Sequence, residues 1–170
     1  FGRVQLKYYP KQMADIQKCM NYFCDCIESL PGLRPIRPAK DSGSTRGGWY
    51  FPTCHYVPAE LGGLSVQRFA QAVLAEGAPC AAGCNKPLHT HPLFHEMDVY
   101  GHGKPTRLAH LPDGVDVRQG LGSLPVTEGI NAGVIIIPWF KHFRKDVIDR
   151  YVAAYKKVID HHAALLGDDR

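Results

Sequence analysis

Residues 11–30 read KQMADIQKCMNYFCDCIESL, and their large apolar side chains recur at alternating steps of three and four residues. Side chains with this spacing lie along one face of an α-helix, so the stretch predicts an amphipathic helix. Its apolar positions are Met13, Ile16, Met20, Phe23, Ile27 and Leu30. Pro31 and Gly32 end the pattern, because proline cannot continue a helix and glycine favours the terminating turn. The stripe fits packing into a core, and it also fits a seam against another domain or subunit.

Weaker patterns after this helix predict the remaining elements. Residues 35–48 are rich in Pro, Gly, Ser and Arg, as in a loop, whereas residues 49–57 alternate aromatic and polar side chains, as in a strand. Pro52 indicates that this strand is an edge strand or contains a bulge. A helix is predicted over 64–76, with Ser65 as its N-cap, Gly77 after its end and an apolar face of Val66, Phe69, Val73 and Leu74. The last two predicted elements are a strand over 133–138 and a helix over 145–166. This order predicts an α+β fold with a small, mostly antiparallel sheet packed with helices.

The composition is typical of one globular domain that can bury a core. The chain has 170 residues, of which 45% are hydrophobic and 21% charged. Its net charge of +4 comes from scattered basic residues, which argues against nucleic-acid binding. The longest apolar run, residues 134–137, is far shorter than the roughly 20 residues of a membrane span. The six cysteines form no CxxC pair and predict reduced, mostly buried thiols in a cytoplasmic protein.

Residues 78–122 contain five of the nine histidines and many prolines and glycines, which predicts a functional loop region. His89 and His91 are two residues apart and would lie on the same side of an extended chain. One interpretation is a zinc site formed by Cys80, Cys84, His89 and His91. A second is that the histidines only satisfy backbone groups of the loop. The third is contact of these histidines with a polar small molecule.

Two further stretches carry candidate binding residues. In residues 98–107, DVYGHGKPTR, the glycines allow close approach of the backbone and Arg107 can bind a carboxylate or phosphate, although a solvated turn explains the stretch equally well. Trp139 follows the predicted strand over 133–138 and is either a pocket wall or part of the core. The sequence contains no nucleophile motif, no His-Glu-x-x-His and no evident pair of catalytic carboxylates, so no catalytic residue is assigned.

Several short motifs, taken in order, resemble one protein family. They are Leu30-Pro31-Gly32-Leu33, Trp49-Tyr50-Phe51, Glu76-Gly77, Lys86-Pro87-Leu88-His89, Pro92-Leu93-Phe94, Leu124-Pro125-Val126-Thr127-Glu128 and Ile137-Pro138-Trp139-Phe140. Together they are similar to the C-terminal part of the DegT/DnrJ family of sugar and cyclitol aminotransferases. The Pro-Leu-His and Leu-Pro-Val-x-Glu segments are the most specific, and the likeness covers nearly the whole chain.

The resemblance implies that residues 1–170 are the small domain of a fold-type I transferase that depends on pyridoxal phosphate, with a linker helix at about residues 11–30. In that family the cofactor forms a Schiff base with a lysine of a large domain, well upstream of the Leu-Pro-Gly-Leu motif. We therefore expect the large domain to be absent from this chain and no lysine here to take that role. The sequence differs from the family at Lys7 and Tyr9, where members often have asparagine or arginine near the cofactor phosphate.

The implied activity is transamination of a keto-sugar or an inosose-like cyclitol with an amino-acid donor, by a homodimer whose small domain closes over the substrate. This chain alone is expected to be inactive. By motif position the substrate-binding candidates are His89, His91, Asn85, Lys86, Arg107 and Trp139. The alternatives are a freestanding binding module for a polar metabolite and, with less support, a Cys/His metal-binding protein. Without the large domain, the Met13–Leu30 stripe would be uncovered, which predicts self-association through this helix.

Overall fold

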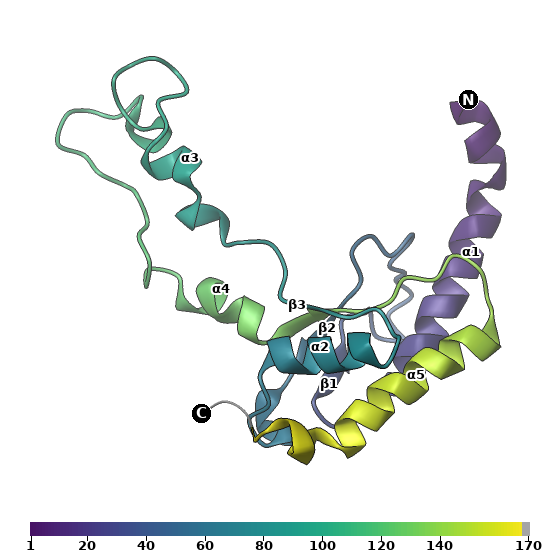
Figure 1. Cartoon of the computed structure of the whole chain (residues 1–170). Coiled ribbons are helices and arrows are strands. Elements are labelled where there is room, and N and C mark those ends of the chain that lie inside the picture. The colour runs from purple at the N-terminus through teal and green to yellow at the C-terminus, as the bar shows by residue number, and fades with distance from the viewer. Residues whose placement is uncertain (168–170) are drawn as a thin grey trace. The chain divides into compact units, whose positions relative to one another are not determined.

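The computed structural model describes residues 1–167 and divides into two units. We call residues 1–83 together with the segment from 132 onward the sheet unit, and Cys84–Asn131 the histidine unit. Figure 1 shows the course of the chain through both of them. Because their mutual placement is not determined, each unit is considered by itself.

The sheet unit is built on four short antiparallel strands in the order β1-β2-β4-β3. The strands are β1 (Leu33–Pro35), β2 (Thr53–Tyr56), β3 (Ala81–Ala82) and β4 (Val134–Ile136). In the centre Cys54 of β2 pairs with Ile135 of β4, and both side chains are fully buried. The predicted α+β class with a small antiparallel sheet is therefore confirmed.

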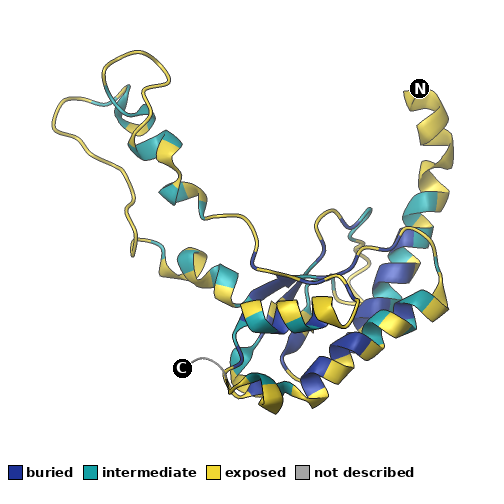
Figure 2. Cartoon of the chain, in the orientation of Figure 1, coloured by how far each residue is buried: buried dark blue, intermediate teal, exposed yellow. Residues whose placement is uncertain are grey.

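Three long helices complete the sheet unit: α1 (Gly2–Ile27), α2 (Val66–Ala75) and α5 (Lys145–Asp160). A series of ring contacts joins them to the sheet. Tyr56 of β2 lies 4.9 Å from Phe69 of α2, Phe69 lies 6.2 Å from Tyr155 of α5, and Tyr155 lies 5.6 Å from Phe23 of α1, measured between ring centroids. Aromatic rings at such distances pack favourably, so one core unites all three helices with the sheet. In Figure 2 the buried residues of these elements are the dark blue parts of the ribbon.

Helix α1 differs from its sequence prediction in extent and in cover. It begins at Gly2 rather than near residue 11, because residues 1–10 carry no apolar stripe and are all exposed, so periodicity could not reveal them. The predicted stripe is real, and Ile16, Met20, Phe23 and Ile27 are all buried inside the sheet unit. The expectation that this stripe is uncovered was therefore wrong, and it gives no reason for self-association.

The strand predicted over residues 49–57 is observed as the shorter β2, and it is not an edge strand. Positive φ angles at Trp49 (54°) and Phe51 (52°) break the extended backbone, and Pro52 precedes the first strand residue, Thr53. Proline lacks an N–H, but outside the ladder it costs no strand hydrogen bond. This is why β2 can lie between two partners, and the prediction that Pro52 marks an edge strand was wrong.

Predictions for the other helices were confirmed in part. The Ser65 side chain accepts a hydrogen bond from the Arg68 backbone N–H at 3.4 Å, as an N-cap does, and Gly77 after the helix has a φ of 87°. Leu74 was expected in the core but is 59% exposed. The last helix ends at Asp160, and a separate 3-10 turn, His162–Leu165, follows it.

The histidine unit contains only short helical segments. These are the 3-10 turns at Leu88–Thr90 and Thr106–Leu108 and the helices α3 (Pro92–His95) and α4 (Pro125–Gly129), followed by a 3-10 turn at Ile130–Ala132 that ends in the sheet unit. No residue from 84 to 131 belongs to the buried core. The unit is therefore organised by hydrogen bonds and local turns more than by apolar burial.

The six cysteines are free, and four of them, Cys19, Cys24, Cys54 and Cys80, are buried as predicted. Burial raises the pKa of the Cys24 and Cys54 thiols to about 12, so they remain protonated and unreactive at neutral pH. No helix within residues 1–167 combines the length and the apolar character needed to cross a membrane.

Candidate functional site

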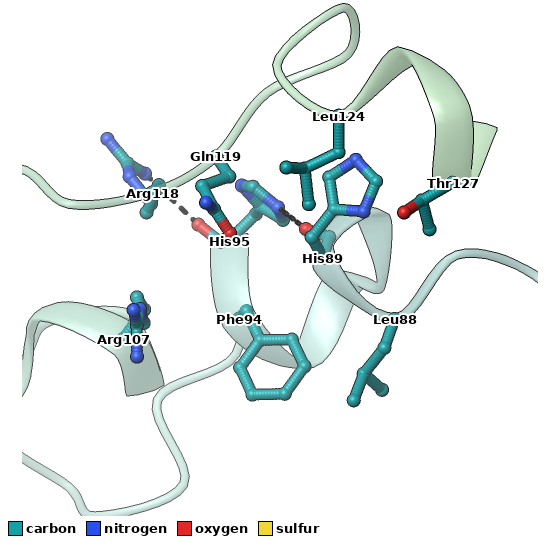
Figure 3. Close-up of a pocket in the computed structure, with 9 residues that line it drawn as sticks. All are labelled: Leu88, His89, Phe94, His95, Arg107, Arg118, Gln119, Leu124 and Thr127. Atoms are coloured by element: carbon teal, nitrogen blue, oxygen red, sulfur yellow. Dashed lines mark hydrogen bonds between the residues drawn. The ribbon is translucent and has the colours of Figure 1, made fainter.

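The histidine unit encloses a cavity of about 340 Å³. It is lined by Leu88, His89, Phe94, His95, Arg107, Arg118, Gln119, Leu124 and Thr127, all drawn in Figure 3. Apolar side chains provide part of the wall, and two arginines, two histidines, an amide and a hydroxyl group provide the polar groups. A concave site with a few polar groups on an apolar surface is typical of small-molecule binding.

His89 is the most enclosed polar side chain of this wall, since only 6% of it is exposed. It lies in the turn Leu88–Thr90, and its Nε2 atom is 2.9 Å from Oε1 of Glu128 in α4. Glu128 also accepts hydrogen bonds from the backbone N–H groups of Gly122 (2.7 Å) and Leu124 (3.1 Å). One carboxylate therefore joins three segments of the unit around His89.

These contacts determine the charge of Glu128. The hydrogen bond from the Gly122 N–H, followed by those from His89 and the Leu124 N–H, lowers the pKa of the Glu128 carboxyl group below its ordinary value. Hydrogen bonding to the charged form favours that form, so Glu128 is ionised at neutral pH. The other nitrogen of His89, Nδ1, is buried and has no hydrogen-bond partner within residues 1–167.

Two arginines of the wall differ in how they are paired. Arg118 forms several hydrogen bonds to Asp116, which lower the pKa of that carboxyl group to about 2, and its Nη1 donates to the His95 carbonyl at 3.2 Å. The His95 ring in turn hydrogen-bonds the His89 carbonyl. Arg107 has no hydrogen-bond or ion-pair partner in the described part of the chain and is exposed. Its guanidinium group is available to an anionic or carbonyl group in the cavity.

The structure places the six predicted substrate-binding residues differently. His89 and Arg107 line the cavity. His91 does not: it is the N-cap of α3, and its Nδ1 accepts a hydrogen bond from the Leu93 N–H at 3.1 Å. Asn85 and Lys86 are exposed and do not line the cavity. Trp139 belongs to the sheet unit, where its side chain is 48% exposed and donates a hydrogen bond to the Gly48 carbonyl at 3.1 Å. Their roles in binding stay predictions.

Sequence reasoning missed most of the wall. His95, Arg118, Gln119 and Thr127 were not singled out, and Glu128 was noted only as part of the Leu-Pro-Val-x-Glu motif. Glu128 could have been predicted, because its Leu-Pro-Val-x-Glu motif and the Pro-Leu-His motif of His89 were both noted, and a carboxylate often orients an imidazole. Arg118 and Gln119 could not be predicted from residue spacing, because they lie in a loop without regular secondary structure.

The zinc interpretation receives no support. No group of three or more His, Cys, Asp or Glu side chains within residues 1–167 is arranged to bind a metal ion. Cys80 is buried in the sheet unit, whereas Cys84 is exposed in the histidine unit.

The cavity also does not fit the covalent attachment of pyridoxal phosphate. That bond needs a lysine amine, and no lysine is among the lining residues of the described chain. The nearest lysine in sequence to Arg107 is Lys104, and it is paired with Asp113 at 2.6 Å. No step of chemistry on the cofactor is therefore assigned to these residues.

A second cavity, of about 420 Å³, lies in the sheet unit between α1 and the loop that follows β1. Arg37 in its wall is nearly buried, with 6% of the side chain exposed, and pairs with Asp25 (2.7 Å) and Glu28 (2.6 Å). Its charge is thus satisfied within the protein, and this cavity contains no unpartnered buried polar atom in the described residues.

Comparisons with known proteins identify the fold. No family model and no curated protein match the sequence. Among solved structures, a protein described as a sugar aminotransferase, Spr1654 from Streptococcus pneumoniae, in its PMP form, is similar with a TM-score of 0.61 and 16% identity over 95% of this chain and 34% of its own. DesI, solved in the presence of its TDP-sugar product, gives a TM-score of 0.58 and 19% identity over 94% and 34%.

A DegT DnrJ EryC1 StrS aminotransferase from Brucella abortus gives a TM-score of 0.53 and 14% identity over 89% of this chain and 32% of its own. At such identities the likeness establishes the fold alone. The chain thus has the fold of one part of DegT/DnrJ-type sugar aminotransferases, and it spans about a third of their length.

Proposed function

We propose that this chain is the small-domain part of an aminotransferase that uses pyridoxal phosphate and converts a keto-sugar or an inosose-like cyclitol. The single observation that carries the proposal is the cavity of the histidine unit, whose wall contains the nearly buried His89 and the unpaired Arg107. The shared fold with sugar aminotransferases supports it. The homodimer, the cytoplasmic location, the amino-acid donor and the absence of nucleic-acid and membrane partners belong to the same proposal.

In this proposal the chain binds and encloses the substrate, and another part of the enzyme carries the lysine that binds the cofactor. His89 forms a hydrogen bond with the substrate ring, and Arg107 contacts an oxygen or an anionic group of the same molecule. The apolar side chains Leu88, Phe94 and Leu124 exclude water and pack against the C–H face of the ring. All five side chains line one cavity, so a single small molecule can contact them together.

The first test adds pyridoxal phosphate to the chain and records its absorption spectrum. We expect no band of an internal aldimine and no borohydride-stable adduct concentrated on one lysine, because the wall has no lysine. A borohydride-stable adduct on one specific lysine would count against the proposed division of labour.

The second test is an NMR titration of the chain with scyllo-inosose and with a nucleotide-linked keto-sugar. The shifts are expected to cluster at the cavity and to be lost in His89→Gln. The matched control is His91→Gln, because His91 is close in sequence but does not line the cavity. Equal losses in both variants, or no response to either ligand, would contradict the proposal.

The cavity lies entirely within the histidine unit, and this observation favours a second candidate function, a freestanding module that binds a polar metabolite. The two functions differ in their response to a complementing large domain. If the chain is a small domain, a large domain supplied separately restores transaminase activity, whereas a freestanding module binds its ligand equally well without one.

A further inference from the structure

The imidazole of His89 has one bonded and one unpartnered nitrogen. Nε2 is 2.9 Å from Glu128 Oε1, whereas Nδ1 has no hydrogen-bond partner in residues 1–167. The side chain is 94% buried, and Nδ1 has essentially no contact with solvent. Buried polar atoms in folded proteins are nearly always hydrogen-bonded. Among the described residues of this wall, Nδ1 is therefore the one buried polar side-chain atom that lacks a hydrogen-bond partner.

Glu128 determines which nitrogen of His89 carries the proton. Its carboxylate already accepts from the Gly122 and Leu124 N–H groups and is ionised at neutral pH, so it can only accept a hydrogen bond. The hydrogen between Glu128 and His89 must then belong to Nε2. In a neutral imidazole the other nitrogen, Nδ1, is in consequence a hydrogen-bond acceptor.

We propose that Glu128 is a positioning residue that maintains the Nε2–H tautomer of His89, so that Nδ1 accepts a hydrogen bond from a hydroxyl group of the ligand in the cavity. This inference rests on the proposed function for the ligand class, a polyhydroxylated ring. Such a ring offers O–H donors, whereas a simple carboxylate at neutral pH has no proton to donate. The tautomer therefore makes the Nδ1 position selective for a hydroxyl group over a carboxylate.

One hydroxyl group of the wall lies beside His89 without forming a hydrogen bond with Nδ1. Thr127 is the only lining residue with a hydroxyl group, and Figure 3 shows its side chain and that of Leu124 beside the His89 ring. Because Nδ1 has no exposed surface, a ligand hydroxyl reaches it only when one of these neighbours moves aside. Thr127→Val removes this hydroxyl group and keeps the shape of the side chain.

The tautomer is measured by the ¹⁵N resonances and long-range proton couplings of the ring in the full 170-residue chain at neutral pH, with His89→Asn for assignment. We expect a single Nε2–H tautomer in the wild type and in Thr127→Val, and a mixture of tautomers in Glu128→Gln. The control is Glu96→Gln, which changes an exposed carboxylate of the same unit. An Nδ1–H tautomer in the wild type, or an unchanged tautomer in Glu128→Gln, would overturn the inference. If the histidine unit unfolds in Glu128→Gln, the tautomer measured in the wild type is sufficient to test the inference.

The ligand part is tested on the same samples with myo-inositol as the probe and acetate as the anionic control. Saturating myo-inositol is expected to shift the Nδ1 resonance in the wild type and in Thr127→Val, and acetate to leave it unchanged. No shift with myo-inositol, or equal shifts with both probes, overturns the selectivity. These failures differ from a failure of the proposed function, since the ring tautomer is read without any substrate and the function is judged by keto-sugar binding and complementation.

Discussion

The two units of this chain reach order by different physical means. In the sheet unit, Phe23, Phe69 and Tyr155 are fully buried, and Tyr155 of α5 contacts the rings of the other two, from α1 and α2. In the histidine unit no residue is part of the core, and the carboxylate of Glu128 joins separate segments by three hydrogen bonds. Apolar burial is insensitive to pH and tolerant of polar surface changes, whereas hydrogen bonds to an ionised group depend on the charge of that group. The candidate binding site lies in the second kind of structure.

The largest expected effect is on the core of the sheet unit. Phe23→Ala removes a fully buried ring that contacts Tyr155 at 5.6 Å and Phe140 at 5.5 Å, so we expect a loss of about 3–5 kcal/mol in the free energy of unfolding. Urea unfolding followed by circular dichroism measures it. Tyr50→Ala, at a side chain that is 93% exposed, is the control and should change stability by less than about 0.5 kcal/mol.

Glu128→Gln should open the histidine unit and leave the sheet unit intact. The amide has less negative charge to attract the Gly122 and Leu124 N–H groups, so their amide hydrogens should exchange faster. Hydrogen exchange of these two amides, compared with that of Ile135 in β4, measures the difference. Equal acceleration in β4 would show that the two units are not independent in stability.

Lowering the pH should weaken the same hydrogen bonds of Glu128 that Glu128→Gln weakens. Because the pKa of Glu128 is lower in the folded unit than in the unfolded chain, its contribution is complete above the unfolded value and is lost as pH falls through the folded value. Exchange at Gly122, corrected for the intrinsic rate, should therefore accelerate as pH falls below the ordinary range of a glutamate. In Glu128→Gln this pH dependence should be absent, and its persistence would implicate another carboxylate such as Asp116.

The smallest expected effect is at the N-terminus of α2. Ser65→Ala removes the hydrogen bond from the Arg68 N–H, which should lower the free energy of unfolding by about 1 kcal/mol. Chemical denaturation measures this, with Ser29→Ala at an exposed turn position as the control. A change confined to the histidine unit would contradict the assignment of this cap to the stability of the sheet unit.

The sequence alone determined the elements whose signal is local. The stripe from Ile16 to Ile27, the Ser65 cap, Gly77 and the strand at Val134–Ile136 were all predicted, because periodicity and capping depend on neighbours in the chain. The part of α1 at residues 2–10 and the strands Leu33–Pro35 and Ala81–Ala82 were not predicted. A helix turn without an apolar stripe and a strand of two or three residues have no periodicity to read.

Only the tertiary structure decided how the site is composed. His89 and Arg107 were predicted from residue type, but their separation from His91, Asn85 and Lys86 depends on how the loops fold. The approach of Glu128 to His89 joins residues 39 positions apart in sequence, and it determines which ring nitrogen lacks a partner. Hydrogen bonds between distant segments leave no pattern in a single sequence, because each partner is chosen by geometry and not by spacing along the chain.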